Sequence, residues 1–434
     1  MSLSRSEVTQ FFSHFTLPLN SLVKQSRKQM KVAEEKAARN PPLTVAWISN
    51  FPLEWLPELP ESLRGLPKSN PGTWQLVLLE EFQKNPALNI HVIVLRKNIE
   101  RDLVFERNKV VFHVLKIPGG LRAPSFFWID TFRIRRELEK IKPHVVHAWG
   151  TEQGAALVAS RLPYPYLVTI QGLLTWYKKL IPLVRYDRFA AWLEDVSLRR
   201  ANIATTESNF AVHYLQERYS KLCVHQAEHA ANWFFHQIQR RSQIDPVRFI
   251  YVGTLCYRKG TDLLLRALNE IAREIPFELM MVSGANREFV NQMKPSLSAE
   301  FWRRIIFKTD LSPSEVAEEL AQATIMLMPT RADTSPNAVK EAVVAGVPVV
   351  ASKIGGIVDY VFEDKNGMLF DSGDLPGFIA AIRKACCHPQ FSRGRVDAET
   401  LEQMRNYLSP SAMHERFFEA YEKTRKSNLG CMRN

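Results

Sequence analysis

The feature that most constrains the fold of this chain is an alternation of short apolar segments with longer helical segments, which begins at Leu43. Short apolar strands separated by helices are typical of a parallel sheet that helices cover on both faces. The first series is expected to contain strands at Leu43–Ser49, Ile90–Leu95, Val145–Ala148, Tyr166–Ile170 and Ile203–Thr205, and helices at Trp74–Gln83, Phe132–Lys140 and Phe189–Arg199.

The alternation starts again after a polar, basic segment. We therefore predict an α/β fold of two doubly wound, Rossmann-like domains that face each other across a cleft, with ligands bound beyond the carboxyl ends of the strands. The second series is expected to contain strands at Phe249–Val252, Phe277–Ser283, Ile305–Lys308, Ile325–Met328 and Val347–Ala351, and helices at Thr261–Arg273, 314–321, Pro336–Ala345 and Pro376–Ala385. The predicted boundaries are an arm at 1–40, an N-terminal domain at 41–235, a linker at 236–247, a C-terminal domain at 248–405, and a helix and tail at 406–434 that cross back to the N-terminal domain.

Composition narrows the class of protein. The chain has 434 residues, of which 46% are hydrophobic and 24% charged, and these values exclude wholesale disorder and a disulfide-stapled miniprotein. The net charge of +12 favours an anionic partner, such as a phosphorylated substrate, a nucleic acid or an anionic membrane surface. The five cysteines form no C-x-x-C pair, and neither a spanning stretch nor a secretory signal is evident. These features predict a cytoplasmic protein that can be peripheral at the inner face of the membrane.

Residues 1–40 form a basic, amphipathic arm. The apolar residues within Val8–Phe15 recur at helical spacing, and six basic residues follow within 24–39. Two interpretations stay open: the phenylalanine face packs on the body of the protein, or the arm lies on a membrane surface.

A glycine-bracketed loop, 253–260, follows the first strand of the second series. It places Arg258 and Lys259 just before a helix that opens at Thr261. Backbone amides and the helix dipole favour an anion at such a position, and the two cations could close on it. In the alternative interpretation, both cations are solvated surface side chains.

A second loop precedes the expected helix Pro336–Ala345. Ser335 is expected to cap this helix and Gly346 to end it. Asp333 then lies in the loop and Glu341 lies inside the helix. The acidic loop residue, the bare helix N-terminus and the helix carboxylate could bind the sugar, diphosphate and ribose of a sugar nucleotide, respectively. Alternatively, Asp333 caps the helix and Glu341 is an exposed charge.

These segments resemble the retaining glycosyltransferases of the GT-B fold, family four, whose signature is two acidic residues separated by seven. Asp333 and Glu341 have this spacing. The resemblance runs nearly from Leu43 to Lys423, and further matching segments are 253–260, His147–Glu152, Lys353–Asp359, Val361–Phe370 and a final helix around Met413–Lys423.

The resemblance implies an enzyme that needs no metal and no cofactor, uses a nucleotide sugar as co-substrate, and glycosylates a carbohydrate or lipid-linked acceptor. It implies that Lys259 and Arg258 stabilise the leaving diphosphate, that Asp333 holds the donor sugar, and that Glu341 holds the ribose. The implied donor-binding positions are Gly72, Thr73, Gly253, Thr254, Gly284, Thr334, Ser335, Pro336 and Asn337, and those on the acceptor or sugar side are His147, Glu152, Gln171 and Gly172.

Several positions depart from the family pattern. Asp333 stands where glutamate is usual, and Thr254 stands where the first phosphate-binding arginine is usual, so Arg258 would have to supply that charge. Gln171 replaces a common histidine and cannot titrate. Gly72–Thr73 replaces a glycine pair that often opens the first helix.

Other candidate residues have plainer interpretations. His225, His229 and His236 form no recognised ligand array, and we expect no metal site. The proline-rich loop Phe51–Gly72 is either a lid over the cleft or a rigid surface loop. The mixed aromatic and basic segment 176–192 fits helix packing, an anionic membrane or a lipid-phosphate acceptor, and nucleic acid is not an expected partner.

We therefore expect a retaining hexosyltransferase that moves a sugar from a nucleotide diphosphate to an acceptor hydroxyl, in surface polysaccharide or glycolipid synthesis. The alternatives are a sugar-nucleotide epimerase or phosphorylase on the same fold, and a non-catalytic protein that binds polyanions or membranes. A nucleotide-linked oxidoreductase is disfavoured because no G-x-G-x-x-G follows the first strand.

Overall fold

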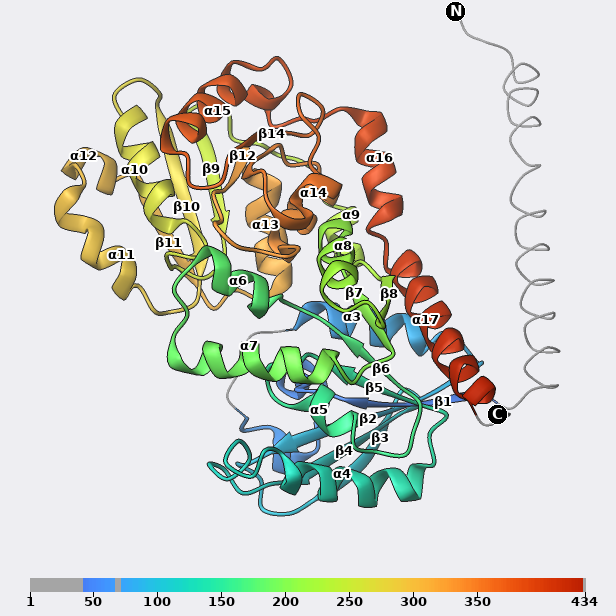
Figure 1. Cartoon of the computed structure of the whole chain (residues 1–434). Coiled ribbons are helices and arrows are strands. Elements are labelled where there is room, and N and C mark those ends of the chain that lie inside the picture. Colours follow the sequence, from blue (N-terminus) through green and yellow to red (C-terminus); the bar gives the residue numbers. More distant parts are fainter. Residues whose placement is uncertain (1–41, 67–71, 432–434) are drawn as a thin grey trace, which may run out of the picture.

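The computed structural model describes residues 42–66 and 72–431. These residues form two α/β domains, each built on one sheet with helices on its faces (Figure 1). The predicted fold class is therefore confirmed. The predicted arm at 1–40 lies outside the described residues. Within the described residues, no helix is long and apolar enough to cross a membrane.

The N-terminal domain is built on an eight-stranded sheet in the order β3-β4-β2-β1-β5-β6-β7-β8. The neighbouring strands are parallel except β3 and β4, which are antiparallel. The strands are β1 (Leu43–Ile48), β2 (Leu88–Arg96), β3 (Leu103–Arg107), β4 (Val110–Lys116), β5 (Val145–Trp149), β6 (Tyr166–Thr169), β7 (Ile203–Thr206) and β8 (Cys223–Gln226). The sequence analysis missed β3, β4 and β8.

The helices of this domain connect its parallel strands and cover the two faces of the sheet (Figure 1). They are α3 (Thr73–Phe82), α4 (Trp128–Ile141), α5 (Ala155–Ala159), α6 (Leu174–Leu180), α7 (Arg185–Leu198) and α8 (Asn209–Arg218). The short helix α9 (Trp233–His236) follows β8 and packs on the C-terminal domain, whose core contains Phe235.

The C-terminal domain contains a six-stranded, all-parallel sheet in the order β11-β10-β9-β12-β13-β14. Its strands are β9 (Val247–Val252), β10 (Phe277–Ser283), β11 (Ile305–Thr309), β12 (Ile325–Met328), β13 (Val349–Ser352) and β14 (Gly367–Phe370). Its helices are α10 (Thr261–Ile271), α11 (Glu288–Met293), α12 (Ala299–Trp302), α13 (Pro313–Gln322), α14 (Asn337–Val344), α15 (Leu375–Cys387) and α16 (Ala398–Tyr407). Local sequence explains the start of α13, where Ser312 caps the helix, Pro313 is its first residue, and Ser312 and Glu315 form a capping box.

The segment expected to be the linker, 236–247, is bound to the C-terminal domain. The guanidinium group of Arg240 is buried and donates to the backbone oxygens of Ala323 (2.5 Å) and Gly394 (3.1 Å). Desolvation lowers the pKa of Arg240 to about 10. The linker therefore belongs structurally to the C-terminal domain.

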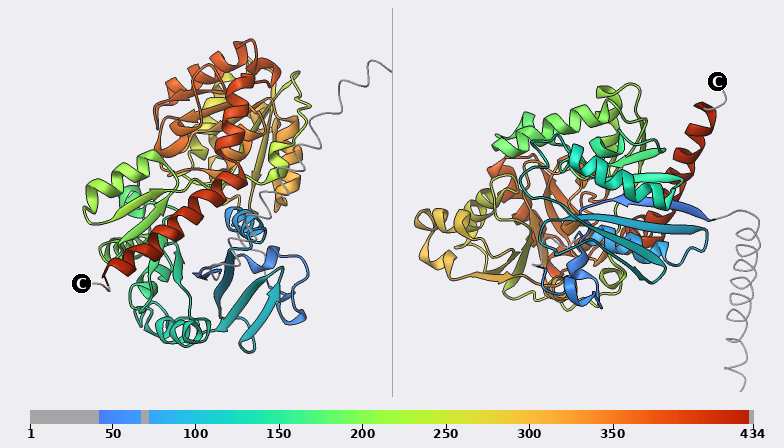
Figure 2. Two further views of the ribbon diagram at one scale, coloured as in Figure 1. Left: turned by 90° about the vertical axis from the view of Figure 1, so that its right-hand side faces the viewer. Right: turned by 90° about the horizontal axis from the view of Figure 1, so that it is seen from below.

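The last helix, α17 (Pro410–Cys431), leaves the C-terminal domain after α16 and packs against the N-terminal domain (Figure 2). Met413, Phe417 and Tyr421 are buried in the same core as the residues of β1 and β2. The hydroxyl of Tyr421 accepts a hydrogen bond of 2.9 Å from the indole nitrogen of Trp47 in β1. The chain thus passes between the domains a second time.

Candidate functional site

The two loops singled out in the C-terminal domain meet at the carboxyl edge of its sheet, because β9 and β12 are neighbouring strands. The ammonium group of Lys259, after β9, forms an ion pair with the carboxylate of Asp333, after β12. Arg258 Nη1 lies 4.0 Å from Asp333 Oδ2 and donates to the backbone oxygen of Ala332 at 3.0 Å. The structure therefore gathers Arg258, Lys259 and Asp333 into one cluster, which we call the Lys259–Asp333 cluster.

Two glycines allow these loops to approach each other. Gly260 has a φ of +71°, and a Cβ there would overlap the backbone oxygen of Pro329. Gly355 has a φ of +57°, and a Cβ there would overlap the backbone oxygen of Asp333. Both positions need a left-handed backbone and no side chain, which only glycine supplies without strain.

The start of α14 differs from the prediction. Pro336, with extended backbone, occupies the N-cap position, and no side chain caps the helix. Ser335 is not the cap, because its hydroxyl donates to Glu228 Oε1 of the N-terminal domain at 2.8 Å. Gly346 follows the helix with a φ of +75°, as expected for a helix stop.

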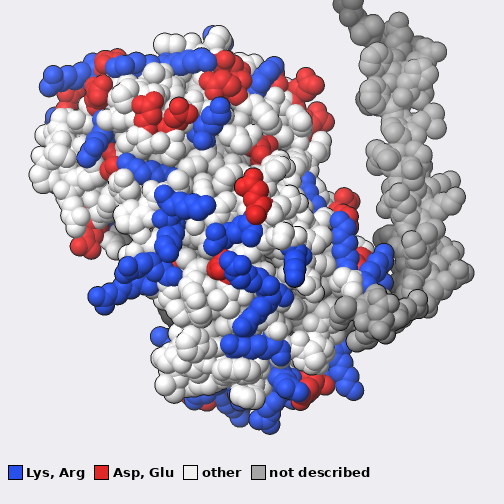
Figure 3. Space-filling view, in the orientation of Figure 1, with Lys and Arg blue, Asp and Glu red and all other residues white. Residues whose placement is uncertain are grey.

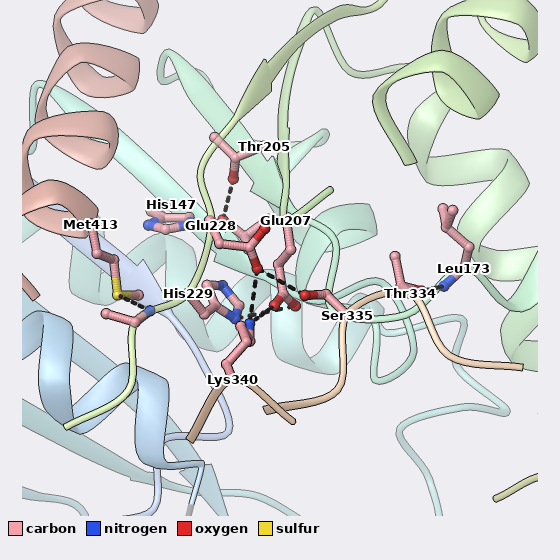
Figure 4. Close-up of polar contacts among 12 residues, drawn as sticks. His147, Leu173, Thr205, Glu207, Glu228, His229, Thr334, Ser335, Lys340 and Met413 are labelled. Carbon is pink, nitrogen blue, oxygen red and sulfur yellow. Dashed lines mark hydrogen bonds and ion pairs between the residues drawn. The ribbon is translucent and has the colours of Figure 1, made fainter. Parts of the chain in front are cut away.

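Thr334 contacts the N-terminal domain as well. Its amide donates to the hydroxyl of Tyr177 in α6 at 3.2 Å, and its own hydroxyl accepts from the amide of Leu173 at 3.3 Å (Figure 4). The three successive residues 333–335 therefore face Lys259, Tyr177 and Glu228. The backbone that was expected to hold the diphosphate lies at the boundary between the domains.

A buried ion cluster lies beside this loop (Figure 4). The ammonium group of Lys340, on α14, donates to Glu207 Oε2 at 2.6 Å and to Glu228 Oε1 at 3.0 Å, and all three side chains are buried. His229 Nδ1 lies 3.2 Å from Glu207 Oε1. The carboxylates belong to the N-terminal domain and the lysine to the C-terminal domain, so the cluster ties the domains together.

Burial and the neighbouring charges shift the pKa values of this cluster in opposite directions. Desolvation would lower the pKa of Lys340, but the two carboxylates outweigh it and raise that pKa, so the lysine stays charged. Desolvation raises the pKa of Glu228 to about 7 even beside the lysine. His229 and Lys340 instead hold the pKa of Glu207 below its ordinary value, against the effect of burial.

The sequence analysis missed this cluster, although the sequence contains a signal for it. Lys340 is four residues after Pro336 and three before Val343. It therefore shares the apolar face of α14 rather than the solvent face. A lysine on an apolar face requires a buried partner.

The carboxyl group of Glu341, the next residue, accepts no hydrogen bond from any residue that the structure describes. Its side chain keeps partial exposure, yet enough protein surrounds it for desolvation to raise its pKa to about 8. It is neither a plain surface charge nor bound to another side chain, so its carboxyl group is available to a ligand.

The remaining donor-side candidates lie around the same edge of the C-terminal sheet. Gly253 follows β9, and Thr254 is exposed. Gly284 is exposed directly after β10, the neighbour of β9. The side-chain oxygen of Asn337, at the first turn of α14, is buried and has no hydrogen-bond partner among the described residues.

A pocket of about 320 Å³ lies at the carboxyl edge of the N-terminal sheet. Three predicted residues, Gly72, Glu152 and Gln171, line it. Thr73 begins α3 next to Gly72, and Gly172 is buried next to Gln171. Lining residues that the sequence analysis did not single out include Trp74, Gln75, Arg122, Asp130 and Trp149.

The pocket contains a mixture of aromatic rings, amides and charges. Arg122 Nε donates to Asp130 Oδ2 at 2.9 Å, and burial raises the pKa of Asp130 despite that arginine. Desolvation also raises the pKa of Glu152, whose carboxylate accepts from the amide of Thr151 at 3.0 Å. Aromatic rings with amides and carboxyl groups are suited to a ligand with many hydroxyls.

His147 does not line this pocket, so its placement on the acceptor side is wrong. It is fully buried in β5, with Nδ1 2.8 Å from the hydroxyl of Tyr421 and Nε2 2.6 Å from that of Thr169. Desolvation keeps its pKa well below the ordinary value, so the ring is neutral. Its role is to join β5 to β6 and to α17.

The structure places no group of three or more His, Cys, Asp or Glu side chains to hold a metal ion among residues 42–66 and 72–431. His225 contacts the backbone oxygen of Arg416 at 3.0 Å. His229 faces Glu207 in the cluster described above.

Comparison with known proteins identifies the class. The fold matches solved glycosyltransferases of the GT-B type: a sucrose-phosphate synthase from Thermosynechococcus elongatus has a TM-score of 0.71 at 15% identity, with 88% of this chain and 98% of that chain covered. The Anabaena protein HepE, solved with UDP-glucose, has a TM-score of 0.62 at 12% identity over 88% and 100% of the two chains. These similarities define a two-domain GT-B glycosyltransferase fold.

Family models identify the chain more closely. Residues 77–224 match the model described as Glycosyltransferase Family 4, and residues 246–388 match Glycosyl transferases group 1. The chain belongs to the group 1 glycosyltransferases. Relatives include a glycogen synthase of Mycobacterium tuberculosis, 27% identical over 39% of this chain and 40% of that protein. Another is a GDP-mannose-dependent phosphatidylinositol monomannoside mannosyltransferase of Mycolicibacterium smegmatis, 26% identical over 32% of this chain and 39% of that protein. The matched regions span about two fifths of the length of these relatives.

We predict that Lys340→Met lowers the free energy of unfolding by about 3–5 kcal/mol, because it leaves buried carboxylates without a cation. Urea or thermal denaturation measures the loss. Lys384→Met is the matched control, since Lys384 also contacts two carboxylates, of Glu363 and Asp364, but on the surface. It should cost no more than about 1 kcal/mol. Adding Glu207→Gln to Lys340→Met should restore part of the stability, and equal losses for both lysine variants would contradict the prediction.

We predict that Glu341→Gln stabilises the protein more at pH 8 than at pH 5. With its pKa raised to about 8, folded Glu341 keeps a proton that the unfolded chain releases above about pH 4.5. The free energy of unfolding therefore falls as the pH rises from about 4.5 to about 8. Glutamine cannot titrate, so the variant does not undergo this fall. Melting temperatures at both pH values measure the difference from wild type. Glu270→Gln, at an exposed position on α10, controls for removal of a surface charge. A gain that does not grow with pH would rule out the protonated carboxyl.

Proposed function

We propose that this glycosyltransferase transfers a hexose from a nucleotide-diphosphate sugar to an acceptor hydroxyl with retention of configuration. The observation that carries the proposal is the Lys259–Asp333 cluster, which sets two cations and a carboxylate at one edge of the sheet, beside the start of α14. A diphosphate needs fixed positive charge, and a sugar needs a hydrogen-bond acceptor for its hydroxyls.

As the glycosidic bond breaks, negative charge grows on the leaving diphosphate. Arg258 and Lys259 are gathered at this edge before the donor arrives, so they stabilise that charge after only a local turn of the Lys259 side chain. Asp333 forms an ion pair with Lys259, and it accepts hydrogen bonds from the sugar once the ammonium group turns to the phosphate. The departing phosphate oxygen takes the proton of the acceptor hydroxyl on the same face of the sugar, which gives retention.

Glu341 binds the ribose hydroxyls in this proposal. Its carboxyl group has no partner among the described residues and is protonated near neutral pH, since its pKa is about 8. It can therefore donate to one hydroxyl and accept from another. We propose that the reaction uses neither a metal ion nor a resident cofactor, because the two cations already face the diphosphate.

The acceptor occupies the pocket that Gly72, Glu152 and Gln171 line in the N-terminal domain. We propose that it is a carbohydrate or a lipid-linked carbohydrate, in the synthesis of a surface polysaccharide or a glycolipid. Two kinds of relative support this choice: glycogen synthases, and a transferase whose name specifies a lipid, the phosphatidylinositol monomannoside mannosyltransferase of Mycolicibacterium smegmatis.

A thermal-shift screen tests donor binding. UDP-, GDP-, ADP- and dTDP-sugars are compared at equal concentrations, and one nucleotide class should raise the melting temperature well above the others. A ligand at 100 times its Kd adds about 2.7 kcal/mol to the free energy of unfolding. The melting temperature should therefore rise by a few degrees. The variant Asp333→Asn should reduce the shift. Equal curves for all four classes and for buffer alone would count against the enzyme as proposed.

We predict that Lys259→Ala lowers kcat by about 10²–10³-fold, the usual effect of removing one fixed stabiliser of developing charge. Donor turnover is measured with the nucleotide sugar that the screen selects. Arg266→Ala, an exposed cation on the neighbouring helix α10, is the matched control and should leave kcat unchanged. Wild-type turnover in Lys259→Ala would remove this lysine from the site.

A further inference from the structure

The described part of the chain exposes large hydrophobic side chains unevenly. Of the fourteen such side chains that are exposed, eight lie in two short segments of the N-terminal domain, 121–132 and 180–192. Among them are Phe132 at 61% exposed, Trp128 at 49% and Trp192 at 47%. Scattered apolar side chains need no explanation, but a concentration of this kind marks an interaction surface.

The two segments form one continuous surface. The rings of Phe126, before α4, and Trp192, on α7, lie 6.1 Å apart in edge-to-face contact. Trp128 and Phe132 are 5.9 Å apart at the start of α4. Phe126 has a φ of +47°, a backbone conformation that phenylalanine rarely adopts. The loop thus holds an aromatic ring outward at some conformational cost.

Cations surround these rings. Lys178, Lys179, Arg185 and Arg188 are exposed, and none forms an ion pair with a residue that the structure describes. Asp187 is the single acidic residue within the segment 178–192. In Figure 3, Lys and Arg side chains gather in the middle of this face, over α6 and α7. Lys179 lies over the ring of Tyr214, 5.1 Å from its centroid. Exposed aromatic rings mixed with cations that form no ion pair match the chemistry of an anionic lipid surface, where the rings enter the headgroup region and the cations meet the phosphates.

This surface borders the acceptor pocket. The hydroxyl of Tyr186, an exposed residue of α7, donates to the backbone oxygen of Glu152 at 3.2 Å, and Glu152 lines the pocket. A smaller cavity of about 210 Å³ is lined by both Tyr186 and Arg122, and Arg122 also lines the acceptor pocket. A membrane against this surface would therefore lie next to the pocket.

We propose that the face formed by 121–132 and 178–192, which we call the aromatic–basic surface, docks this protein on an anionic lipid bilayer. Docking brings the acceptor pocket to the level of the headgroups. It therefore selects the lipid-linked class among the acceptors considered above, and only this consequence rests on the proposed function. The surface itself is independent of the predicted role of the arm.

Vesicle sedimentation of the full chain tests the proposal. The probes are vesicles of phosphatidylcholine alone and of phosphatidylcholine with 30% phosphatidylglycerol. Wild type should pellet with the anionic vesicles and not with the neutral ones. Trp128→Ser/Phe132→Ser should weaken this binding at least tenfold. The variant Lys178→Gln/Lys179→Gln/Arg185→Gln/Arg188→Gln should weaken it at least as much, since each cation near such a surface contributes about fivefold.

Matched controls separate the surface from general effects. Val104→Ser/Ile306→Ser removes two exposed apolar side chains elsewhere, and Arg266→Gln/Arg273→Gln/Lys365→Gln/Arg393→Gln removes four exposed cations of the C-terminal domain. Both controls should bind like wild type. Thermal melting verifies that all variants are folded.

Three results would overturn the proposal: wild type that pellets with neither vesicle, wild type that pellets equally with both, and surface variants that bind like their controls. If wild type pellets with neither vesicle, the aromatic–basic surface would instead be a binding site for a protein partner. The assay contains no nucleotide sugar, so its failure leaves the donor screen untouched. Failure of the donor screen likewise leaves vesicle binding intact.

Discussion

The two domains hold their relative position through a charge that neither could bury alone. Lys340 brings an ammonium group into the interior from the C-terminal domain, and Glu207 and Glu228 of the N-terminal domain neutralise it. Isolating any of these groups from water without its partners would cost several kcal/mol. Glu228 also binds Ser335, so the same carboxylate that neutralises Lys340 fixes the loop carrying Asp333. The position of the candidate donor site therefore depends on an interaction outside it.

This arrangement also describes how the site can change when a donor binds. The amide of Thr334 is occupied by Tyr177, and the ammonium group of Lys259 is occupied by Asp333. A diphosphate competes for both, and it offers stronger, charge-assisted acceptors than a tyrosine hydroxyl does. In the proposed mechanism, donor binding therefore exchanges contacts within and between the domains for contacts to the ligand.

The sequence was sufficient where local pattern decides structure. The strand Ile325–Met328 and the loops around Lys259 and Asp333 lie where apolar runs, glycines and the family resemblance put them. Prediction from the sequence failed where a residue distant in sequence determines which contact a side chain makes. The hydroxyl of Ser335 binds Glu228 instead of capping α14, and His147 is buried by Tyr421, a residue of the last helix. Strand β3 was missed because it lies at the sheet edge and is only partly buried.

The second passage of the chain between the domains, through α16 and α17, limits how they can move. One connection lies between β8 and α9, since Ala230 is buried in the core of the N-terminal domain and Ala231 in the core of the C-terminal domain. The other lies at Leu408–Ser409, between α16 and α17. A hinge motion of one domain relative to the other must therefore change the backbone angles at both connections at once. Separating the two half-sites would also break the buried contacts of Lys340 with Glu207 and Glu228, so two chain connections and one ion cluster together hold the domains in register.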